Sequence, residues 1–397
     1  MIPRASERRG CRVCGRTNLF RYLDLGMQPL ANAFREFDAP LSDEFRVPLV
    51  LQACPQCKLS QLTHVVPKEL LYTTYAYSSG VNRAWHAHCE GLAQRFARPD
   101  AFVIDIASND GTLLSKFAAL GCETLGIEPS TSFSATATYN KVTQWWTRSA
   151  VERLSLIGIA DVITAQNVLG HVDDVHDFMA GIASALKPTG VAVIEVPHLV
   201  KLLSNGVFDT VYHEHLSYWT VTALSALCDA HGLVVQDVQH LDVHGGSIRV
   251  VIGKEKRITR AVETVLVDEA HLLRKPTYLT FSARATRTMA TINEELQGAA
   301  PYYGLGAAAK TTVLLNTLDV RALPCAVFDS TPAKQHLRVP GTQVPVLPEP
   351  HDWSKVDGPV AIFCWNWWQS ALAKMQAAGY RGQVFVPLPK PRWITVA

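Results

Sequence analysis

The 397-residue sequence has no excess of charge of either sign, because 37 lysines and arginines face 35 aspartates and glutamates. Nonspecific binding to nucleic acid or to an acidic membrane usually needs a broad basic field, so any nucleic-acid contact would be local. The sequence also lacks an apolar run of about 20 residues, the length that spans a bilayer. No apolar stretch follows the charged start, as it would in a secretory signal. We therefore expect a cytoplasmic protein that binds neither membranes nor nucleic acid.

Apolar residues make up 48% of the chain, which excludes a disordered or fibrous protein and suggests two or three domains. Between residues 100 and 253, apolar strands alternate with helical stretches, which predicts an α/β domain with a mostly parallel sheet. These strands read AFVIDIA, CETLGIE, DVITAQNVL, VAVIEV, LVVQDV and IRVVIG. One or two helices over 260–298 lead to a second α/β stretch with strands LPCAVFDS, VAIFCW and QVFVP. The predicted domains are 1–72, 73–256 with a helical lead-in, and 257–397.

Four of the nine cysteines form two Cys-x-x-Cys pairs near the N-terminus: Cys11, Cys14, Cys54 and Cys57. Two such pairs can offer four thiolates to one tetrahedral ion and leave no position open, which indicates a structural Zn²⁺ site. The alternative is a set of unrelated thiols. Residues 1 to about 70 are poor in continuous apolar runs, so metal binding would fold this segment. Zinc ribbons also bind nucleic acid, but residues 54–58 lack the lysines and arginines for it.

The stretch VIDIASNDGT, residues 103–112, places a strand, a turn of small residues and a helix start in sequence. Glu128 ends the next strand, where an acid can accept both hydroxyls of a ribose. The missing G-x-G-x-x-G speaks against a dinucleotide, and S-adenosylmethionine, which has no phosphate, suits the acidic turn better. Asp105 or Asp110 would face its amino or sulfonium end. The alternative is an ordinary strand-turn-helix with a capping Asn109 or Asp110.

Asn167 follows the strand DVITAQ, and so lies at the edge of the sheet where open α/β folds bind ligands. His171 comes one helical turn later. A functional role and a purely structural one are equally open for this histidine.

The segment 208–219 holds the densest group of functional side chains. Three interpretations compete: a general base with supporting partners, a His/Glu metal site, or a capped turn that packs aromatic rings. Histidine is the natural base near neutral pH, and no third metal ligand is identifiable by spacing. The group comprises Tyr212, His213, Glu214, His215 and Tyr218.

Two glycine-rich segments remain ambiguous. His244 precedes Gly245 and Gly246, which would let backbone N–H groups approach a ligand or would form a simple hairpin. The segment YGLGAAAK, 303–310, resembles a nucleotide-binding turn, although no obvious strand precedes it. Lys310 would meet a phosphate or merely lie near a helix start.

Taken together, these motifs resemble the S-adenosylmethionine-dependent sugar C-methyltransferases, and in particular those that methylate C3 of nucleotide-linked 4-keto deoxyhexoses in antibiotic biosynthesis. The resemblance runs in matching order from about residue 11 to 390. It implies a zinc domain, a central methyltransferase domain, and a C-terminal Rossmann-like domain that closes over the nucleotide sugar. The motifs are the two cysteine pairs, DIASNDGTLL, GIEP, ITAQNVLGHV, FDTVYHEHLSYWT, VHGGSIRV, YGLGAAAK and the VPGTQVP loop.

The resemblance also implies roles for individual residues. The base corresponds to His215, with Tyr212 and Glu214 close by and His171 on the opposite wall. The cofactor contacts fall on Asp105, Asn109, Asp110, Glu128 and Asn167, to which we add Ser108. The substrate contacts fall on Tyr75, Tyr77 and Ser78, to which we add His213, His244 and Lys310.

The sequence departs from the family pattern at Ala107, where glycine is usual, at Thr311-Thr312 after Lys310, and at His198. The expected reaction begins when His215 removes a proton from the carbon next to a ketone. A tyrosine hydroxyl or a neighbouring histidine such as His171 would then donate to the enolate oxygen. A methyltransferase acting on another carbon, on oxygen or on nitrogen, and a noncatalytic zinc scaffold, are the alternatives. A monomer is expected, although no motif bears on the oligomeric state.

Overall fold

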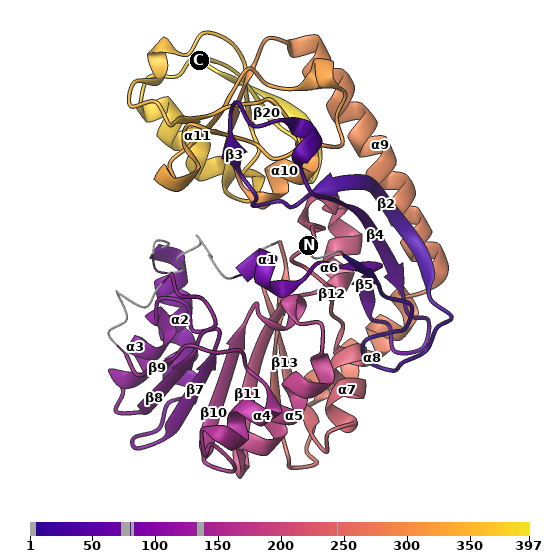
Figure 1. The fold of residues 1–397 in the computed structure, drawn as a ribbon, viewed down its shortest axis with the longest axis vertical. Helices are drawn as coiled ribbons and strands as arrows, with labels where there is room; N and C mark the ends of the chain where they lie inside the picture. The colour runs from indigo at the N-terminus through magenta and orange to yellow at the C-terminus, as the bar shows by residue number, and fades with distance from the viewer. Residues whose placement is uncertain (1–4, 73–79, 81–82, 133–138, 244) are drawn as a thin grey trace. The chain divides into compact units, whose positions relative to one another are not determined.

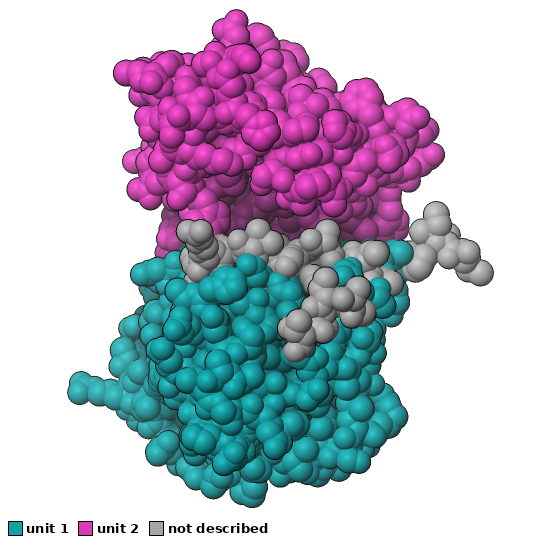
Figure 2. Space-filling model, turned by 90° about the vertical axis from the view of Figure 1, so that its left-hand side faces the viewer, with its two compact units in different colours: residues 1–20, 52–201, 214–274 teal, residues 21–51, 202–213, 275–397 magenta. Residues whose placement is uncertain are grey.

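The computed structural model describes residues 5–72, 80, 83–132, 139–243 and 245–397 (Figure 1). The chain divides into two compact units, coloured separately in Figure 2. Unit 1 comprises residues 1–20, 52–201 and 214–274, and unit 2 comprises 21–51, 202–213 and 275–397. The three domain boundaries expected from the sequence stay predictions.

Unit 1 is built on a seven-stranded sheet of order β13-β14-β11-β10-β7-β8-β9. Neighbours from β11 to β9 run parallel, while β14 is antiparallel to both β11 and β13. The mostly parallel sheet expected from the sequence is therefore confirmed. The strands are β7 (Phe102–Ile106), β8 (Glu123–Ile127), β9 (Lys141–Val142), β10 (Ala160–Gln166), β11 (Leu186–Pro197), β13 (Val234–Leu241) and β14 (Ser247–Gly253).

Apolar runs form the central strands because both faces of the sheet are covered. Ile104 and Ile106 of β7 belong to one buried cluster, while Val103, next to Ile104, belongs to another. Successive side chains point to opposite faces, so one strand serves two cores. The helices of unit 1 include α2 (Arg83–Phe96), α3 (Thr112–Ala118), α4 (Arg148–Arg153), α5 (Val175–Ala185), α7 (Val221–Asp229) and α8 (Arg260–Leu272).

Unit 2 contains a six-stranded sheet of order β18-β16-β15-β19-β20-β21, in which only the last strand pairs antiparallel. Counted along the chain this order is 3-2-1-4-5-6, that of a Rossmann-like sheet. The sequence shows no obvious strand at the start of the segment 303–310, and the structure corrects this, because the first three residues of the segment form β15. The strands are β15 (Tyr303–Leu305), β16 (Val327–Asp329), β18 (Val346–Pro348), β19 (Val360–Ile362), β20 (Gly382–Val386) and β21 (Arg392–Val396). The helices are α9 (Lys275–Ala299), α10 (Ala309–Leu315) and α11 (Trp368–Ala377).

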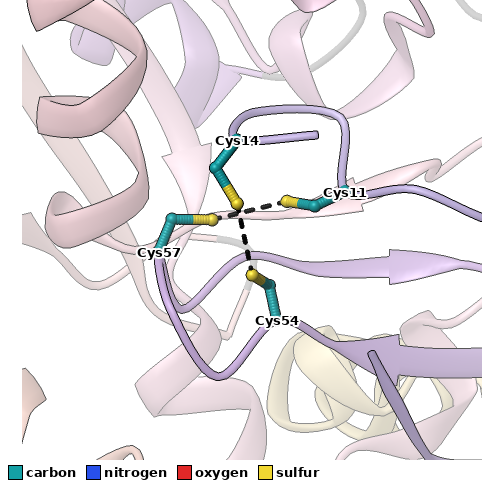
Figure 3. Close-up of side chains that lie close together, drawn as sticks. All are labelled: Cys11, Cys14, Cys54 and Cys57. Atoms are coloured by element: carbon teal, nitrogen blue, oxygen red, sulfur yellow. Dashed lines mark hydrogen bonds between the residues drawn. The ribbon is translucent and has the colours of Figure 1, made fainter. Parts of the chain in front are cut away.

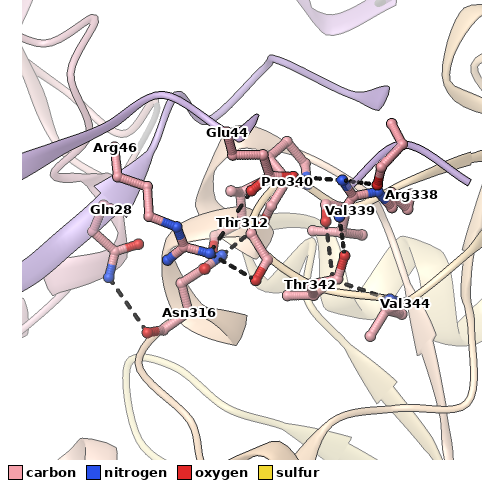
Figure 4. A network of polar contacts seen from close by, with 12 residues as sticks. Gln28, Glu44, Arg46, Thr312, Asn316, Arg338, Val339, Pro340, Thr342 and Val344 are labelled. Atoms are coloured by element: carbon pink, nitrogen blue, oxygen red, sulfur yellow. Dashed lines mark hydrogen bonds and ion pairs between the residues drawn. The ribbon is translucent and has the colours of Figure 1, made fainter. Parts of the chain in front are cut away.

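Segment 21–51, between the two cysteine pairs, belongs to unit 2. It carries most of β2 (Phe20–Pro29) and of β4 (Arg46–Ala53), and β3 (Arg35–Glu36), which pairs with β17 (Leu337–Arg338). The fully buried Arg338 forms an ion pair of 3.1 Å with Glu44 and donates to the carbonyls of Ala39 and Thr342 (Figure 4). A buried guanidinium needs such partners, so Arg338 fixes this segment to the C-terminal part of the unit.

Short elements complete the fold. β1 (Ser6–Glu7) pairs with β6 (His64–Val65), and β5 (Ser60–Leu62) pairs with β12 (Ser217–Tyr218). Helices α1 (Lys68–Tyr72) and α6 (Leu199–Asn205) and the 3₁₀ turns η3 (Leu169–His171) and η4 (Phe208–Thr210) carry several of the predicted site residues or flank them. Within the described ranges, no helix has the length and apolar character needed to cross a membrane.

Candidate functional site

The predicted cofactor residues of unit 1 meet where β7, β8 and β10 end. Asp105 of β7 is paired in register with Thr164 of β10, whose hydroxyl donates to Asp105 Oδ1 over 2.7 Å. The Asp105 side chain is buried, and this burial raises its pKa to about 7. Near neutral pH the carboxyl is therefore poised between its neutral and charged forms, and a nearby cation would favour the charged one.

Glu128, directly after β8, closes the turn that follows β7. One carboxylate oxygen accepts the backbone N–H of Asn109 at 2.9 Å, and the other accepts that of Ser130 at 2.7 Å. Burial raises the pKa of Glu128, opposed by these two donors. Each oxygen of a carboxylate has two acceptor sites, so Glu128 can still accept ribose hydroxyls.

The turn itself has a left-handed backbone. Ala107 and Asn109 have φ values of 57° and 53°, an arrangement that costs a methyl-bearing residue energy. Tyr139 stabilises the turn, because its hydroxyl donates to the Asn109 carbonyl at 2.7 Å and lies 3.0 Å from Ser108 Oγ. A Cβ at Gly111, where φ is 80°, would overlap the Tyr139 ring, so the last position of the turn requires glycine.

Asp110 anchors the start of α3. Its Oδ1 accepts the Thr112 hydroxyl at 2.7 Å, and its Oδ2 accepts the backbone N–H of Gly80 at 2.6 Å. The contact with Gly80 connects the turn to the segment that precedes α2.

Asn167 and His171 extend the same edge of the sheet. Asn167 follows β10 with a left-handed φ of 58°, and its backbone N–H donates to the Glu195 carbonyl of β11 at 2.8 Å. Four residues later, His171 is the last residue of η3.

A cluster of rings surrounds His171. Its Nδ1 lies 3.0 Å from the hydroxyl of Tyr72, and its ring centroid lies 5.0 Å from that of His215. The His215 ring in turn lies 6.3 Å from the Tyr218 ring. Burial lowers the pKa of His171 to about 4 against the opposing effect of the Glu214 carbonyl, so this imidazole is uncharged near neutral pH.

The other residues of segment 208–218 divide between the units, with the boundary between His213 and Glu214. In unit 1, Glu214 is buried and its backbone carbonyl accepts the Tyr72 hydroxyl at 3.0 Å. In unit 2, His213 is buried and its Nε2 lies 3.1 Å from the Val47 carbonyl, while Tyr212 is partly buried.

Lys310 has a well-defined environment within unit 2. Its Nζ donates to Asn366 Oδ1 at 3.2 Å and lies 4.6 Å from the centre of the Trp365 ring. Trp365 Nε1 donates to Asp209 at 2.5 Å, and burial raises the pKa of that carboxyl to about 6. Burial also lowers the pKa of Lys310, which Asp209 partly offsets.

The four paired cysteines converge as the spacing predicts (Figure 3). All four Sγ atoms lie within 4.8 Å of one another, with Cys11 and Cys57 3.4 Å apart and Cys14 and Cys54 3.5 Å apart. A tetrahedral zinc ion with Zn–S bonds of about 2.3 Å needs sulfurs about this close. The contact between the two thiols lowers the pKa of Cys11 and raises that of Cys57, so one of the pair is readily a thiolate. The donor set therefore fits zinc.

Some predicted residues lie outside the described part of the chain, namely Tyr75, Tyr77, Ser78 and His244. Sequence reasoning also missed three hydroxyl groups that contact the predicted ones: those of Tyr72, Tyr139 and Thr164. Thr164 could have been found from the register of β7 and β10, since an interior threonine in an apolar strand needs a hydrogen-bond partner. For Tyr72 the only signal is its place just before the tyrosine-serine segment.

Comparisons with known proteins match three successive parts of the chain. Residues 11–72 match a model of a zinc binding domain, 75–238 match a methyltransferase domain, and 242–389 match the C-methyltransferase C-terminal domain. The chain is similar to C-methyltransferase NovU of Streptomyces niveus, with 28% identity over 97% of this chain and 96% of that protein. The chain is thus similar to this C-methyltransferase over nearly its whole length. It is a methyltransferase that uses S-adenosylmethionine and carries a zinc-binding domain.

Other similarities cover only part of the C-methyltransferase chain. A ubiquinone biosynthesis O-methyltransferase of Rhodopseudomonas palustris is 30% identical over 23% of this chain and 38% of its own. Among solved structures, the Burkholderia thailandensis 1,6-didemethyltoxoflavin-N1-methyltransferase with bound S-adenosylhomocysteine covers 44% of this chain and 79% of its own. Its TM-score is 0.34 and its identity 17%. A likeness at this level supports no conclusion about the present site.

The zinc site generates a direct prediction. The purified C-methyltransferase should contain one zinc ion per chain, and Cys54→Ala should lose it. Because a structural zinc contributes on the order of 10 kcal/mol to folding, we expect the Tm to fall by about 10 °C or more. Metal analysis and thermal unfolding measure both effects. Cys325→Ser, at an exposed cysteine outside the cluster, is the control and should change neither. Full zinc content in Cys54→Ala would contradict the four-cysteine assignment.

Proposed function

We propose that this C-methyltransferase methylates the carbon next to the ketone of a nucleotide-linked 4-keto deoxysugar, at C3. The support is the resemblance of the ordered motifs together with one observation. The imidazoles of His171 and His215, the former uncharged near neutral pH, lie in the same unit as the carboxyl groups of Asp105 and Glu128. A carbon acid needs a base, and a methyl donor that bears a sulfonium needs carboxylates rather than a phosphate cradle.

The donor set around the β7 turn fits S-adenosylmethionine. Asp105 is a buried carboxyl that accepts a threonine hydroxyl, and it would face the amino or sulfonium end of the cofactor. Glu128 would accept the ribose hydroxyls, and Ser108, Asn109, Asp110 and Asn167 are the other proposed contacts. When bound, the cofactor supplies an electrophilic methyl group that needs no further activation.

The residues of the chain prepare the nucleophile. In this proposal His215 would take and keep the proton from the α-carbon, and the C–H electron pair would become the enolate. That carbon would then form its bond to the methyl group as the methyl–sulfur bond breaks, with S-adenosylhomocysteine as the leaving group. Glu214 and Tyr212 would fix the orientation of the His215 ring. A tyrosine hydroxyl would donate to the enolate oxygen, a contribution of about 3 kcal/mol for one well-placed donor.

The remaining predicted substrate contacts are Tyr75, Tyr77, Ser78, His213, His244 and Lys310, and they stay predictions. The Lys310 environment is compatible with a nucleoside diphosphate, although Lys310 already has Asn366 as a partner. Methylation of a nonsugar carbon, of oxygen or of nitrogen is the alternative. A panel of 4-keto nucleotide sugars, simple phenols and amines, with detection of a methylated product, distinguishes these substrates.

The role of His215 predicts a loss of proton exchange. With a keto sugar nucleotide and S-adenosylhomocysteine in deuterium oxide, the wild-type enzyme should exchange the α-proton of the substrate. His215→Ala should slow both this exchange and methylation by at least about 100-fold, because a positioned base contributes that much. Exchange is followed by NMR. The exposed His351→Ala variant should behave as wild type. Retained exchange in His215→Ala would remove His215 as the base.

The raised pKa of Asp105 predicts pH-dependent cofactor binding. In the free protein Asp105 holds a proton below about pH 7, and a bound cation favours its carboxylate form. The affinity for the cationic cofactor should therefore rise between about pH 6 and 8, as this proton is lost. In Asp105→Asn this part of the dependence should disappear. Calorimetry with S-adenosylmethionine, which carries both the sulfonium and the ammonium group, measures it, and the difference between the two proteins cancels the titration of the ligand itself. Asp319→Asn, at an exposed aspartate of unit 2, is the control. Identical pH profiles for Asp105→Asn and wild type would argue against Asp105 as the cation's partner.

A further inference from the structure

Tyr72 contacts both His171 and the backbone of Glu214, the residue before His215, although no motif in the sequence marks Tyr72. It is the last residue of α1, and its ring packs edge-on against both His171, at 5.7 Å, and Trp145, at 6.2 Å. The ammonium group of Lys68 lies over the Trp145 ring, 4.4 Å from the ring centroid. Lys68 stands about one helical turn before Tyr72 in α1. These contacts restrict the Tyr72 ring and therefore the direction of its hydroxyl.

The hydroxyl of Tyr72 has a single proton and lies within hydrogen-bond distance of both Glu214 and His171. Its oxygen lies 3.0 Å from the backbone carbonyl of Glu214 and 3.0 Å from Nδ1 of His171. A carbonyl only accepts, so the proton of Tyr72 is donated to Glu214. The contact with His171 then needs a proton on Nδ1, which donates to the Tyr72 oxygen.

We propose that Tyr72 is a positioning residue that holds His171 as the Nδ1–H tautomer, so that Nε2 of His171 is a proton acceptor in the active site. This inference rests on the proposed function for its catalytic meaning, but the tautomer itself does not. An imidazole that is uncharged near neutral pH and has its proton on Nδ1 carries a lone pair and no proton on Nε2. His171 consequently cannot be the donor to the enolate oxygen that the sequence suggested as one option.

A neutral acceptor beside His215 has a definite use. When His215 takes the proton of the substrate it becomes a cation, and its ring centroid is 5.0 Å from that of His171. An acceptor lone pair favours that cation, whereas an N–H group directed at it would oppose it. The tyrosine hydroxyl of the proposed mechanism then remains as the donor to the enolate oxygen, and His171 does not share this role.

The tautomer can be observed without any substrate. Long-range ¹H–¹⁵N NMR of histidine-labelled protein separates protonated from bare ring nitrogens, and His171→Gln identifies the signals of His171 by their loss. We expect a protonated Nδ1 and a bare Nε2 in the wild type at about pH 7.5, well above the pKa of this imidazole. In Tyr72→Phe we expect the Nδ1–H form to lose its dominance. A wild-type His171 that carries its proton on Nε2, or an unchanged tautomer in Tyr72→Phe, would overturn the inference.

Kinetics test whether the tautomer matters. Tyr72→Phe should lower kcat and the rate of α-proton exchange by about 10- to 100-fold while the Kd for S-adenosylhomocysteine stays unchanged. Tyr302→Phe is the matched control, because Tyr302 also donates a buried hydroxyl to a backbone carbonyl, that of Ala322 at 2.6 Å, in unit 2. It should leave both rates as in wild type. Equal rates for Tyr72→Phe and wild type would contradict a positioning role.

The two proposals fail in different ways. If wild-type enzyme methylates no keto sugar, the proposed substrate is wrong, while the NMR result still decides the tautomer. If methylation is found but His171 is protonated on Nε2, the proposed substrate stands and the role of Tyr72 is wrong.

Discussion

A carboxylate at the end of the second strand closes the turn after the first strand, and the cofactor edge of unit 1 depends on it. Glu128 accepts the N–H groups of Asn109 in that turn and of Ser130 two residues beyond itself. Unit 2 repeats the device: Asp329 accepts the N–H of Ala307 at 2.6 Å and of Thr331 at 2.8 Å. A left-handed turn has N–H groups that no strand can pair, so a fixed acceptor holds it in place. The carboxyl ends of parallel strands then present a preformed edge.

The sequence alone predicts the features that depend on local spacing. Two Cys-x-x-Cys pairs predict the four-sulfur cluster, and continuous apolar runs predict the buried strands of unit 1 because both faces of a parallel sheet are covered. The short strand β15 escapes such reasoning, since three residues that include a glycine show no period. The assignment of segment 21–51 to unit 2 escapes it too, because it depends on Arg338 finding Glu44, which is remote in the chain.

In the candidate site, too, the residues marked by local sequence patterns can be predicted, whereas those set by contacts remote in the chain are harder to predict. Asp105, Glu128 and Asn167 could be predicted as site residues because each stands at or just beyond a strand end, which chain topology brings to one edge. Their partners are harder to find. Thr164 can be found only once the register between β7 and β10 is known, and Tyr72 depends on how α1 lies against η3. Hydroxyl groups have little sequence signature of their own. They nevertheless decide which neighbouring group donates and which accepts a hydrogen bond, because each hydroxyl donates one proton and can also accept one.

Burial gives the ionisable groups of this edge a common property. It raises the pKa of Asp105 to about 7 and that of Glu128 above its ordinary value, and it lowers the pKa of His171 to about 4. Each shift favours the uncharged form, because a buried charge loses its hydration. A sulfonium or ammonium group beside Asp105 would favour its carboxylate, and a proton from a carbon acid would create an imidazolium beside His171. Burial strengthens both effects, because a charge that enters a buried site is screened less by water than one at the surface.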